Sequence, residues 1–413
     1  MSDELAHNVR RYRRAKGLSQ EQLAQRSGLS VGPVRRIEQG DDNVRMETLH
    51  CIARGLGVQT SDLMAAGPPE PVRHDDPNSQ NLRELRIALT PVLSLGPAGA
   101  PAGEEPDLRR LRRMTYDNSV LYFNDTYQSV AADLPTLIRA ANDAVAYYDS
   151  GDQRANALVE RSRALNLAGR YLTQIRQFDL AHAAARGAIE DAKAAGNNLV
   201  AASAVGGMCW LLVRTERFDE AEDIAVATMD IVEPKIMGAA PDEYATWGGL
   251  AMEAAAAAAR NNRPKEAEAL RKAAGTAAKA VGRTHRNLLR HWSMFGPVTA
   301  AMKELEDFMI AGDARTVVRK SKEEPTLQAK HWEQLGGPST NDGNRYRLDL
   351  ARAHVRTGDA TLAMEELSHL DETAPEWFRH QASAAITFEE ITKKRRTLTT
   401  DMREVGTHLG VFA

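Results

Sequence analysis

The chain has few of the residues that mark metal-binding, disulfide-bonded or membrane-spanning proteins. It contains two cysteines, Cys51 and Cys209, and neither lies in a CxxC pair or beside clustered histidines, which argues against a disulfide or a metal site. The longest apolar run, residues 251–259, is alanine-rich and falls far short of the ~20 strongly hydrophobic residues that span a bilayer. The chain does not open with a basic segment followed by a hydrophobic one, so we expect no secretory signal and a cytoplasmic location.

Aromatic residues are also scarce, at 5% of the 413 residues. The alternation of Val, Ile and Thr that is typical of strands is rare, whereas the helix formers alanine, arginine and glutamate are abundant. This composition predicts an all-α protein. The length exceeds the ~250–300 residues at which a single core stops growing, so at least two units are expected. A Gly-Pro-rich break at residues 67–71 marks their boundary.

We therefore predict a first domain over residues 1–66, a connector with a short helix over 67–106, and a second domain over 107–413. The first domain holds 10 Lys and Arg against 8 Asp and Glu, while the rest of the chain is net acidic. Only the N-terminal domain suits a polyanionic partner.

The first domain has the pattern of a helix, a short turn and a helix. Ser19 precedes Gln22 by three residues, a capping-box spacing that starts one helix. Gly28 supplies the turn, and Ser30 is expected to cap the next helix. The small residue Ala24 lies four positions before Gly28, where the two helices cross and a bulky side chain would separate them.

These residues carry a resemblance to a known family. The segments LSQEQLAQRSGLS (18–30) and IEQG (37–40) resemble the Xre, or phage-repressor, helix-turn-helix family. The resemblance implies a five-helix head that binds double-stranded DNA, with the second motif helix in the major groove. It also implies a homodimer on a palindromic operator, because a specific site needs two heads about one DNA turn, ~34 Å, apart.

The family's docking geometry assigns roles to individual residues. Ser19 and Gln20 correspond to phosphate contacts, and Asn43 and Arg45 to contacts with the flanking backbone. The residues that correspond to the start and outer face of the recognition helix are Ser30, Val31, Gly32, Arg35 and Arg36. An ion pair between Arg13 and Glu38 is implied as a structural tie between helices.

The recognition helix departs from the family at Val31-Gly32-Pro33, which replaces commonly polar residues. We expect Val31 to contact a thymine methyl and Arg36 to bond guanine, with DNA shape supplying the remaining discrimination. For Arg35 and Arg36, a position beside a phosphate remains an open alternative.

The second domain shows a repeat. Polar turns at residues 177–179, 217–219, 263–265, 312–314 and 358–360 recur every 40 to 49 residues, and tryptophans stand at Trp210, Trp247, Trp292, Trp332 and Trp377. Such spacing is typical of stacked helix pairs. The openings FDLA (178–181) and FDEA (218–221) resemble tetratricopeptide repeats. We predict an α-solenoid of about five helix pairs and a terminal helix near residues 376–394.

The order of the two domains resembles the peptide-responsive Rap, Rgg, NprR, PlcR and PrgX regulators. It is closer still to Xre regulators of actinobacteria, which have stretches similar to residues 295–297 and 347–354. The resemblance implies a nucleoid-associated transcription regulator controlled by a peptide or metabolite. Inner-face candidates for this effector are Arg170, Gln174, Trp210, Trp247, His291 and Trp292.

Other interpretations of the second domain stay open. A tryptophan at repeat spacing is more often a packing residue than a ligand contact. The alternative function is an adaptor that is tethered to DNA and docks a partner protein without any small ligand. No phosphate-binding glycine motif, metal-ligand spacing or nucleophile signature is present, so we expect neither a cofactor nor an enzyme activity.

Overall fold

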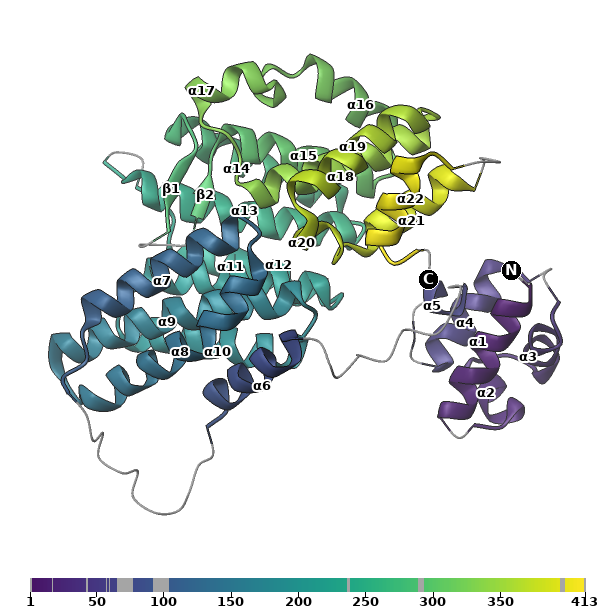
Figure 1. Cartoon of the computed structure of the whole chain (residues 1–413), viewed down its shortest axis with the longest axis horizontal. Helices are drawn as coiled ribbons and strands as arrows, with labels where there is room; N and C mark the ends of the chain where they lie inside the picture. Colours follow the sequence, from purple (N-terminus) through teal and green to yellow (C-terminus); the bar gives the residue numbers. More distant parts are fainter. Residues whose placement is uncertain are drawn as a thin grey trace. The chain divides into compact units, whose positions relative to one another are not determined.

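The computed structural model describes residues 2–16, 18–41, 44–56, 58, 60–64, 77–91, 104–235, 238–288, 293–393 and 398–411. The chain divides into two compact units, residues 1–76 and 77–413, which we call the head and the body. Both are helical, and one small sheet is the only sheet among the described residues (Figure 1). This confirms the predicted fold class. Within the same residues, no helix is long and apolar enough to cross a membrane.

The head consists of five short helices around one core. They are α1 (Ser2–Ala15), α2 (Gln20–Arg26), α3 (Val31–Glu38), α4 (Met46–Leu56) and α5 (Thr60–Met64). Every helix contributes to the core, whose most buried side chains are Val9, Leu23, Val34, Ile37, Ile52, Leu56 and Leu63. Ala24 is only 3% exposed, in keeping with its expected position at the helix crossing.

The start of α2 and the turn between α2 and α3 both follow the local sequence signals. Ser19 Oγ accepts a hydrogen bond from the backbone of Gln22 at 3.1 Å, and the Gln22 side chain accepts from the backbone of Ser19 at 2.8 Å. Gly28 has a φ of 65°, which glycine adopts without a steric penalty. Ser30 occupies the N-cap position of α3, but its side chain makes no capping hydrogen bond to the described residues. The expectation that Ser30 caps this helix is therefore wrong in that detail.

The body is a succession of helices with one small sheet and two short 3-10 turns. Its helices are α6 (Pro77–Leu89), α7 (Leu108–Phe123), α8 (Tyr127–Tyr147), α9 (Gly151–Gln174), α10 (Phe178–Ala194), α11 (Asn198–Arg214), α12 (Phe218–Ile231), α13 (Pro241–Arg260), α14 (Pro264–Val281), α15 (Pro297–Ile310), α16 (Ala314–Glu323), α17 (Trp332–Leu335), α18 (Thr340–Thr357), α19 (Ala360–Thr373), α20 (Pro375–Phe378), α21 (Ala382–Thr392) and α22 (Thr400–His408). The strands are β1 (His285–Asn287) and β2 (Ser293–Phe295), and the 3-10 turns are η1 (Pro325–Leu327) and η2 (Ala329–His331).

One turn geometry recurs between the body's helices. Two residues before the first residue of seven helices, the backbone is left-handed, at Asp125, Arg176, Gly196, Glu216, Asn262, Gly312 and Gly358. The next residue's N–H bonds back to a carbonyl five positions earlier, as in Gln177 to Leu172 at 2.8 Å and Arg217 to Leu212 at 2.9 Å. This is the Schellman arrangement that closes a helix. Seven of the body's helices are thus joined to the helix before them by the same turn.

The array of helices closes on itself. Asp125, between α7 and α8, accepts hydrogen bonds from Asn341 at 3.0 Å and from Asn344 at 2.8 Å, both in α18. The backbone N–H of Gln128 donates to Glu376 at 3.1 Å. One hydrophobic cluster extends from Leu85 in α6 to Val405 in α22. In an open solenoid each repeat contacts only its neighbours, whereas here early and late helices share a core.

Three features of the body differ from the sequence-based expectations or lie outside them. The connector helix α6 packs on the body, where Leu85 is fully buried and Asn142 donates to the carbonyl of Ala88 at 3.1 Å. The hairpin of β1 and β2 was not predicted. The single terminal helix expected over residues 376–394 is wrong, because residues 379–381 separate α20 from α21.

Candidate DNA interface and body cavity

Helix α3 turns one face into the head's core and the other to solvent. Val34 and Ile37 are buried, while Gly32, Arg35 and Arg36 are exposed. A Cβ added at Gly32 would meet nothing within 4 Å. The start of α3 therefore presents an open surface that a DNA groove can approach closely.

The side chain of Glu38, the last residue of α3, accepts hydrogen bonds from two other helices. Arg13 of α1 donates to both carboxylate oxygens, at 2.6 and 2.9 Å, and Gln20 of α2 donates at 2.8 Å. The Glu38 side chain is 3% exposed. Burial by itself would raise the pKa of Glu38, but the bonds from Arg13 and Gln20 outweigh it, and the pKa is lowered. The expected Arg13–Glu38 contact is thus a bidentate ion pair that ties α1 to α3.

Two predicted DNA contacts already have partners within the head. Gln20 uses part of its amide on Glu38, and Arg35 pairs with Glu21 at 2.7 Å. Both members of the Arg35–Glu21 pair are more than half exposed, and such surface pairs contribute at most about 1 kcal/mol. Arg35 can therefore leave Glu21 at little cost when a stronger anion is present.

The remaining predicted contacts differ in their surroundings. The side chain of Arg36 forms no ion pair or hydrogen bond with another described residue, and Arg45 is exposed just before α4. Ser19 and Ser30 are exposed, and Val31 is half-buried. Asn43 lies outside the described residues.

A small helical core, a tight turn at Gly28 and an outward helix with exposed cationic side chains define a helix-turn-helix DNA-binding domain. Residues 4–66 match the family model described as a helix-turn-helix domain. The chain is also 42% identical over 60 residues to the control protein C.SmaI of Serratia marcescens, a match that covers 71% of that protein and 14% of this chain. The chain belongs to the helix-turn-helix family, and it is a DNA-binding transcription regulator of the Xre-like type.

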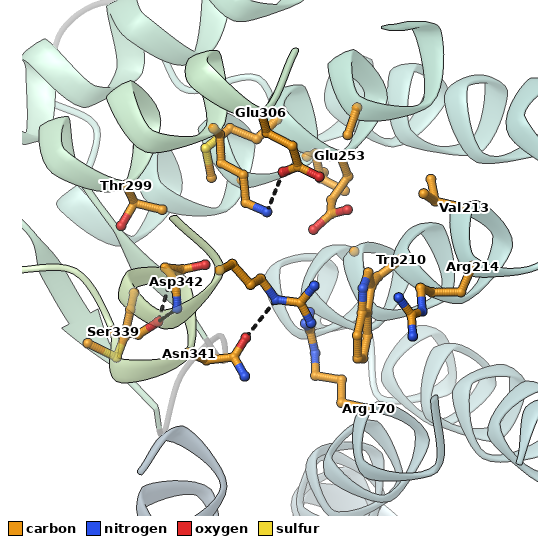
Figure 2. A pocket seen from close by; sticks show the side chains of 18 of the residues that line it. Arg170, Trp210, Val213, Arg214, Glu253, Thr299, Glu306, Ser339, Asn341 and Asp342 are labelled. Atoms are coloured by element: carbon orange, nitrogen blue, oxygen red, sulfur yellow. Dashed lines mark hydrogen bonds and ion pairs between the residues drawn. The ribbon is translucent and has the colours of Figure 1, made fainter. Parts of the chain in front are cut away.

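The body contains a cavity of about 530 Å³ (Figure 2). Its walls come mainly from α11, α13, α15 and α18, with one side chain from α9, and these five helices are far apart in the sequence. These helices place, in chain order, the side chains of Arg170, Trp210, Glu253, Lys303 and Arg345 in the lining, one from each helix. The closure of the array brings α18 opposite α9 and α11, so the cavity depends on the contact between early and late helices.

The structure brings two of the six predicted effector residues to this cavity. Arg170 and Trp210 line it. Gln174 is 2% exposed and accepts a hydrogen bond from Arg345 at 3.3 Å, behind the lining. Trp247 packs against a hydrophobic cluster formed by α11, α12, α13 and α14 and is not part of the lining. His291 and Trp292 lie outside the described residues.

The cavity is lined by more positively than negatively charged side chains. Its lining has six arginine and lysine side chains against four carboxylates. Glu306 is paired twice, with Arg260 at 2.5 Å and with Lys303 at 3.0 Å. Burial opposes its ionisation, but these two cations hold the pKa of Glu306 well below the ordinary value. For Glu253 the balance is reversed, because burial outweighs the nearby Lys303 and Arg170 and raises the pKa.

Cationic groups surround Trp210. The Arg345 guanidinium lies 5.5 Å from the centre of the Trp210 ring, and Arg345 also donates to Asn341 at 2.9 Å. In the view of Figure 2, the Trp210 ring stands between the side chains of Arg170 and Arg214. Partial burial and the positive charges of Arg345, Arg176 and Arg260 lower the pKa of Arg214 to about 10.

Sequence reasoning missed Arg214, Lys303 and Arg345. Each is one charged residue in an amphipathic helix, a pattern that normally indicates a solvated face. The only signal available was the repeat itself, which predicts an inner surface but does not say which charges meet there.

Proposed function

We propose that this regulator acts as a homodimer in the cytoplasm, reads a specific DNA site through α3, and changes its DNA affinity when a small effector occupies the body's cavity. In this assignment residues 1–66 bind DNA, and residues 107–413 sense the effector and dimerise. Residues 67–106 connect these two domains. The observation that carries the DNA-binding part is the exposed face of α3, with Gly32 and Arg36 open to solvent. This is a binding function rather than a catalytic one.

Base recognition is proposed to rest on few direct contacts. Val31 contacts a thymine methyl and Arg36 bonds guanine, while the open surface at Gly32 lets the groove wall come close. Phosphates are held by Ser19, Gln20 and Ser30 at the helix starts and by Asn43 and Arg45 at the flank. DNA shape supplies the remaining discrimination.

The cavity favours an effector over an adaptor function for the body. Its volume of about 530 Å³ lies within the ~300–1,000 Å³ that is usual for small-molecule sites. It is bounded by helices on several sides, whereas docking of a folded partner needs a wide, open surface. A ligand that prefers one conformation of the body shifts the dimer toward the head arrangement belonging to that conformation.

The proposal is tested by sequencing the genomic fragments that copurify with the intact protein and measuring their affinity at several salt concentrations. We expect an inverted repeat whose half-sites are spaced by about one DNA turn or a multiple of it, and an affinity that falls as salt rises. Absence of salt-sensitive binding to any duplex would overturn the DNA-binding function. A single unrepeated site would overturn the dimer.

A further inference from the structure

We propose that the body's cavity binds a small organic oxyanion, a carboxylate or a phosphate, held by Arg214 and Arg345 beside Trp210. The inference rests on the proposed function only where it calls this ligand the effector. The binding site itself is argued from the lining of the cavity.

The first argument is that the positively charged side chains of the cavity outnumber the carboxylates that pair with them. Arg260 and Lys303 share the single carboxylate of Glu306 within ion-pair distance, so these three groups together keep a net positive charge. Arg345 donates to two neutral side chains, Asn341 and Gln174, and has no carboxylate partner among the described residues. The side chain of Arg214 has neither an ion pair nor a hydrogen bond within that part of the chain.

The second argument is the repulsion that this arrangement maintains. Arg345, Arg176 and Arg260 all act on Arg214 with the same sign of charge, and burial adds to their effect. Like charges gathered beside a partly buried site destabilise the protein unless an anion neutralises them. Burial also raises the pKa of Glu253 in spite of the nearby Lys303 and Arg170, so those two cations do not fully offset the cost of burying this carboxyl.

The third argument is geometric. Arginine presents a planar fork of donors that matches carboxylate and phosphate oxygens. Asn341 orients Arg345 through its Nε, and the ring of Trp210 lies over the same guanidinium. The group is therefore fixed in place before a ligand arrives, with its remaining N–H donors available in the cavity. Such preorganisation reduces the ordering cost of binding.

Two probes test the site in the intact protein: citrate for carboxylates and inorganic pyrophosphate for phosphates. Each is compared with sodium chloride at equal ionic strength by thermal unfolding and by titration calorimetry. At about a hundred times its Kd, we expect a binding anion to raise the Tm of the body by about 4 °C. A response to citrate alone assigns a carboxylate, to pyrophosphate alone a phosphate, and to both a general oxyanion site. Equal effects of chloride and both probes overturn the proposal.

Variants locate the binding. Arg214→Gln is expected to weaken anion binding at least tenfold, while the Tm of the ligand-free protein stays the same or rises because repulsion is removed. The control is Arg356→Gln, an exposed arginine of α18 that does not line the cavity, and it should retain full anion binding. Equal anion responses in Arg214→Gln and the unmodified protein would place the anion elsewhere and overturn the site.

A parallel DNA titration separates this inference from the proposed function. Anion binding without any change in DNA affinity leaves the site standing and removes its role as effector site. If the protein binds no duplex either with or without the anion, the proposed function is overturned, while the anion response of the body remains measurable and interpretable.

Discussion

At the scale of single residues, Glu38 determines how α1, α2 and α3 are held together. Its carboxylate accepts from Arg13 and Gln20 and is almost completely buried. Removing one member of a buried ion pair leaves an uncompensated charge, which costs about 3 kcal/mol or more. Any DNA-binding defect at this position is therefore indirect, through the position of α3.

We predict that Glu38→Gln lowers the local unfolding free energy of the head by about 3 kcal/mol. Hydrogen exchange of the head's amides in the full chain measures this change. Glu47→Gln, an exposed carboxyl in α4, is the matched control and should change it by less than about 0.5 kcal/mol. Comparable effects of the two substitutions would show that the buried pair has no special importance.

The same pair predicts a pH dependence. Because the folded-state pKa of Glu38 is below its ordinary value of 4.5, its stabilising contribution is complete above that value and is lost as the pH falls through the lower, folded-state pKa. The stability difference between the unmodified protein and Glu38→Gln should therefore shrink on acidification below about pH 4.5. A difference that stays constant would contradict the lowered pKa.

Arg36 has two possible functions in DNA binding that a mutation can distinguish. If it reads a base, Arg36→Ala should weaken binding to the cognate site by roughly 1–3 kcal/mol and relax specificity at one position. If it contacts a phosphate, the loss should be equal on all sequences and the salt dependence should become shallower. Titration of cognate and scrambled duplexes distinguishes the two. Arg54→Ala, an exposed arginine of α4, is the control.

At the scale of elements, the body's helices begin where short polar turns predict. Phe178, Phe218, Pro264, Ala314 and Ala360 each open a helix. These starts could be predicted because the signal is local: a turn residue in the left-handed region, then an N-cap, then an amphipathic segment. The sequence contains that whole signal within a few residues.

The recurring turn leads to a stability prediction. Gly358 has a φ of 94° with open space around it, so Gly358→Ala should destabilise the body by about 1 kcal/mol through backbone strain alone. Gly275 lies within α14, where an added Cβ also meets nothing within 4 Å, so Gly275→Ala should stabilise by about 0.5–1 kcal/mol. Urea unfolding followed by tryptophan fluorescence measures both. Effects of the same sign would contradict this assignment of the turn.

Other elements could not be predicted, because their cause is tertiary. The strands β1 and β2 are three residues each, too short to show alternation. Their position follows from Phe295, which is 1% exposed and so close to α13 that a Cβ on Gly248 would lie 2.3 Å from its ring. The break after α20 likewise follows the complete burial of Trp377 and Phe378, with no proline or glycine at residues 379–381 to announce it.

At the scale of the whole molecule, the sequence predicts the two domains but not the cavity between the body's helices. Arg170 and Trp210 were named by analogy with the peptide-responsive regulators, whereas Arg214 and Arg345 belong to α11 and α18 and line the same cavity only because the array closes. No local pattern encodes a contact between residues more than a hundred positions apart. The cavity's charge is therefore a property of the fold that the sequence does not display.

The proposed dimer is a prediction at this scale. The full chain should sediment with the mass of two protomers at micromolar concentration, and two chains should bind each palindromic site, because one head reads too few base pairs for a specific site. Sedimentation equilibrium with and without a duplex of the selected sequence measures both quantities. A monomer that remains monomeric on DNA would contradict the proposal.

Closure of the helical array also limits how the body can vary. Open repeat proteins gain or lose whole units with little penalty, since each unit needs only its neighbours. Here the bonds from Asn341 and Asn344 to Asp125 join the two ends of the series. Inserting or deleting a helix pair between α9 and α17 would pull those ends apart and open the cavity. The number of helices in this body is thus set by the size of the ring they must complete.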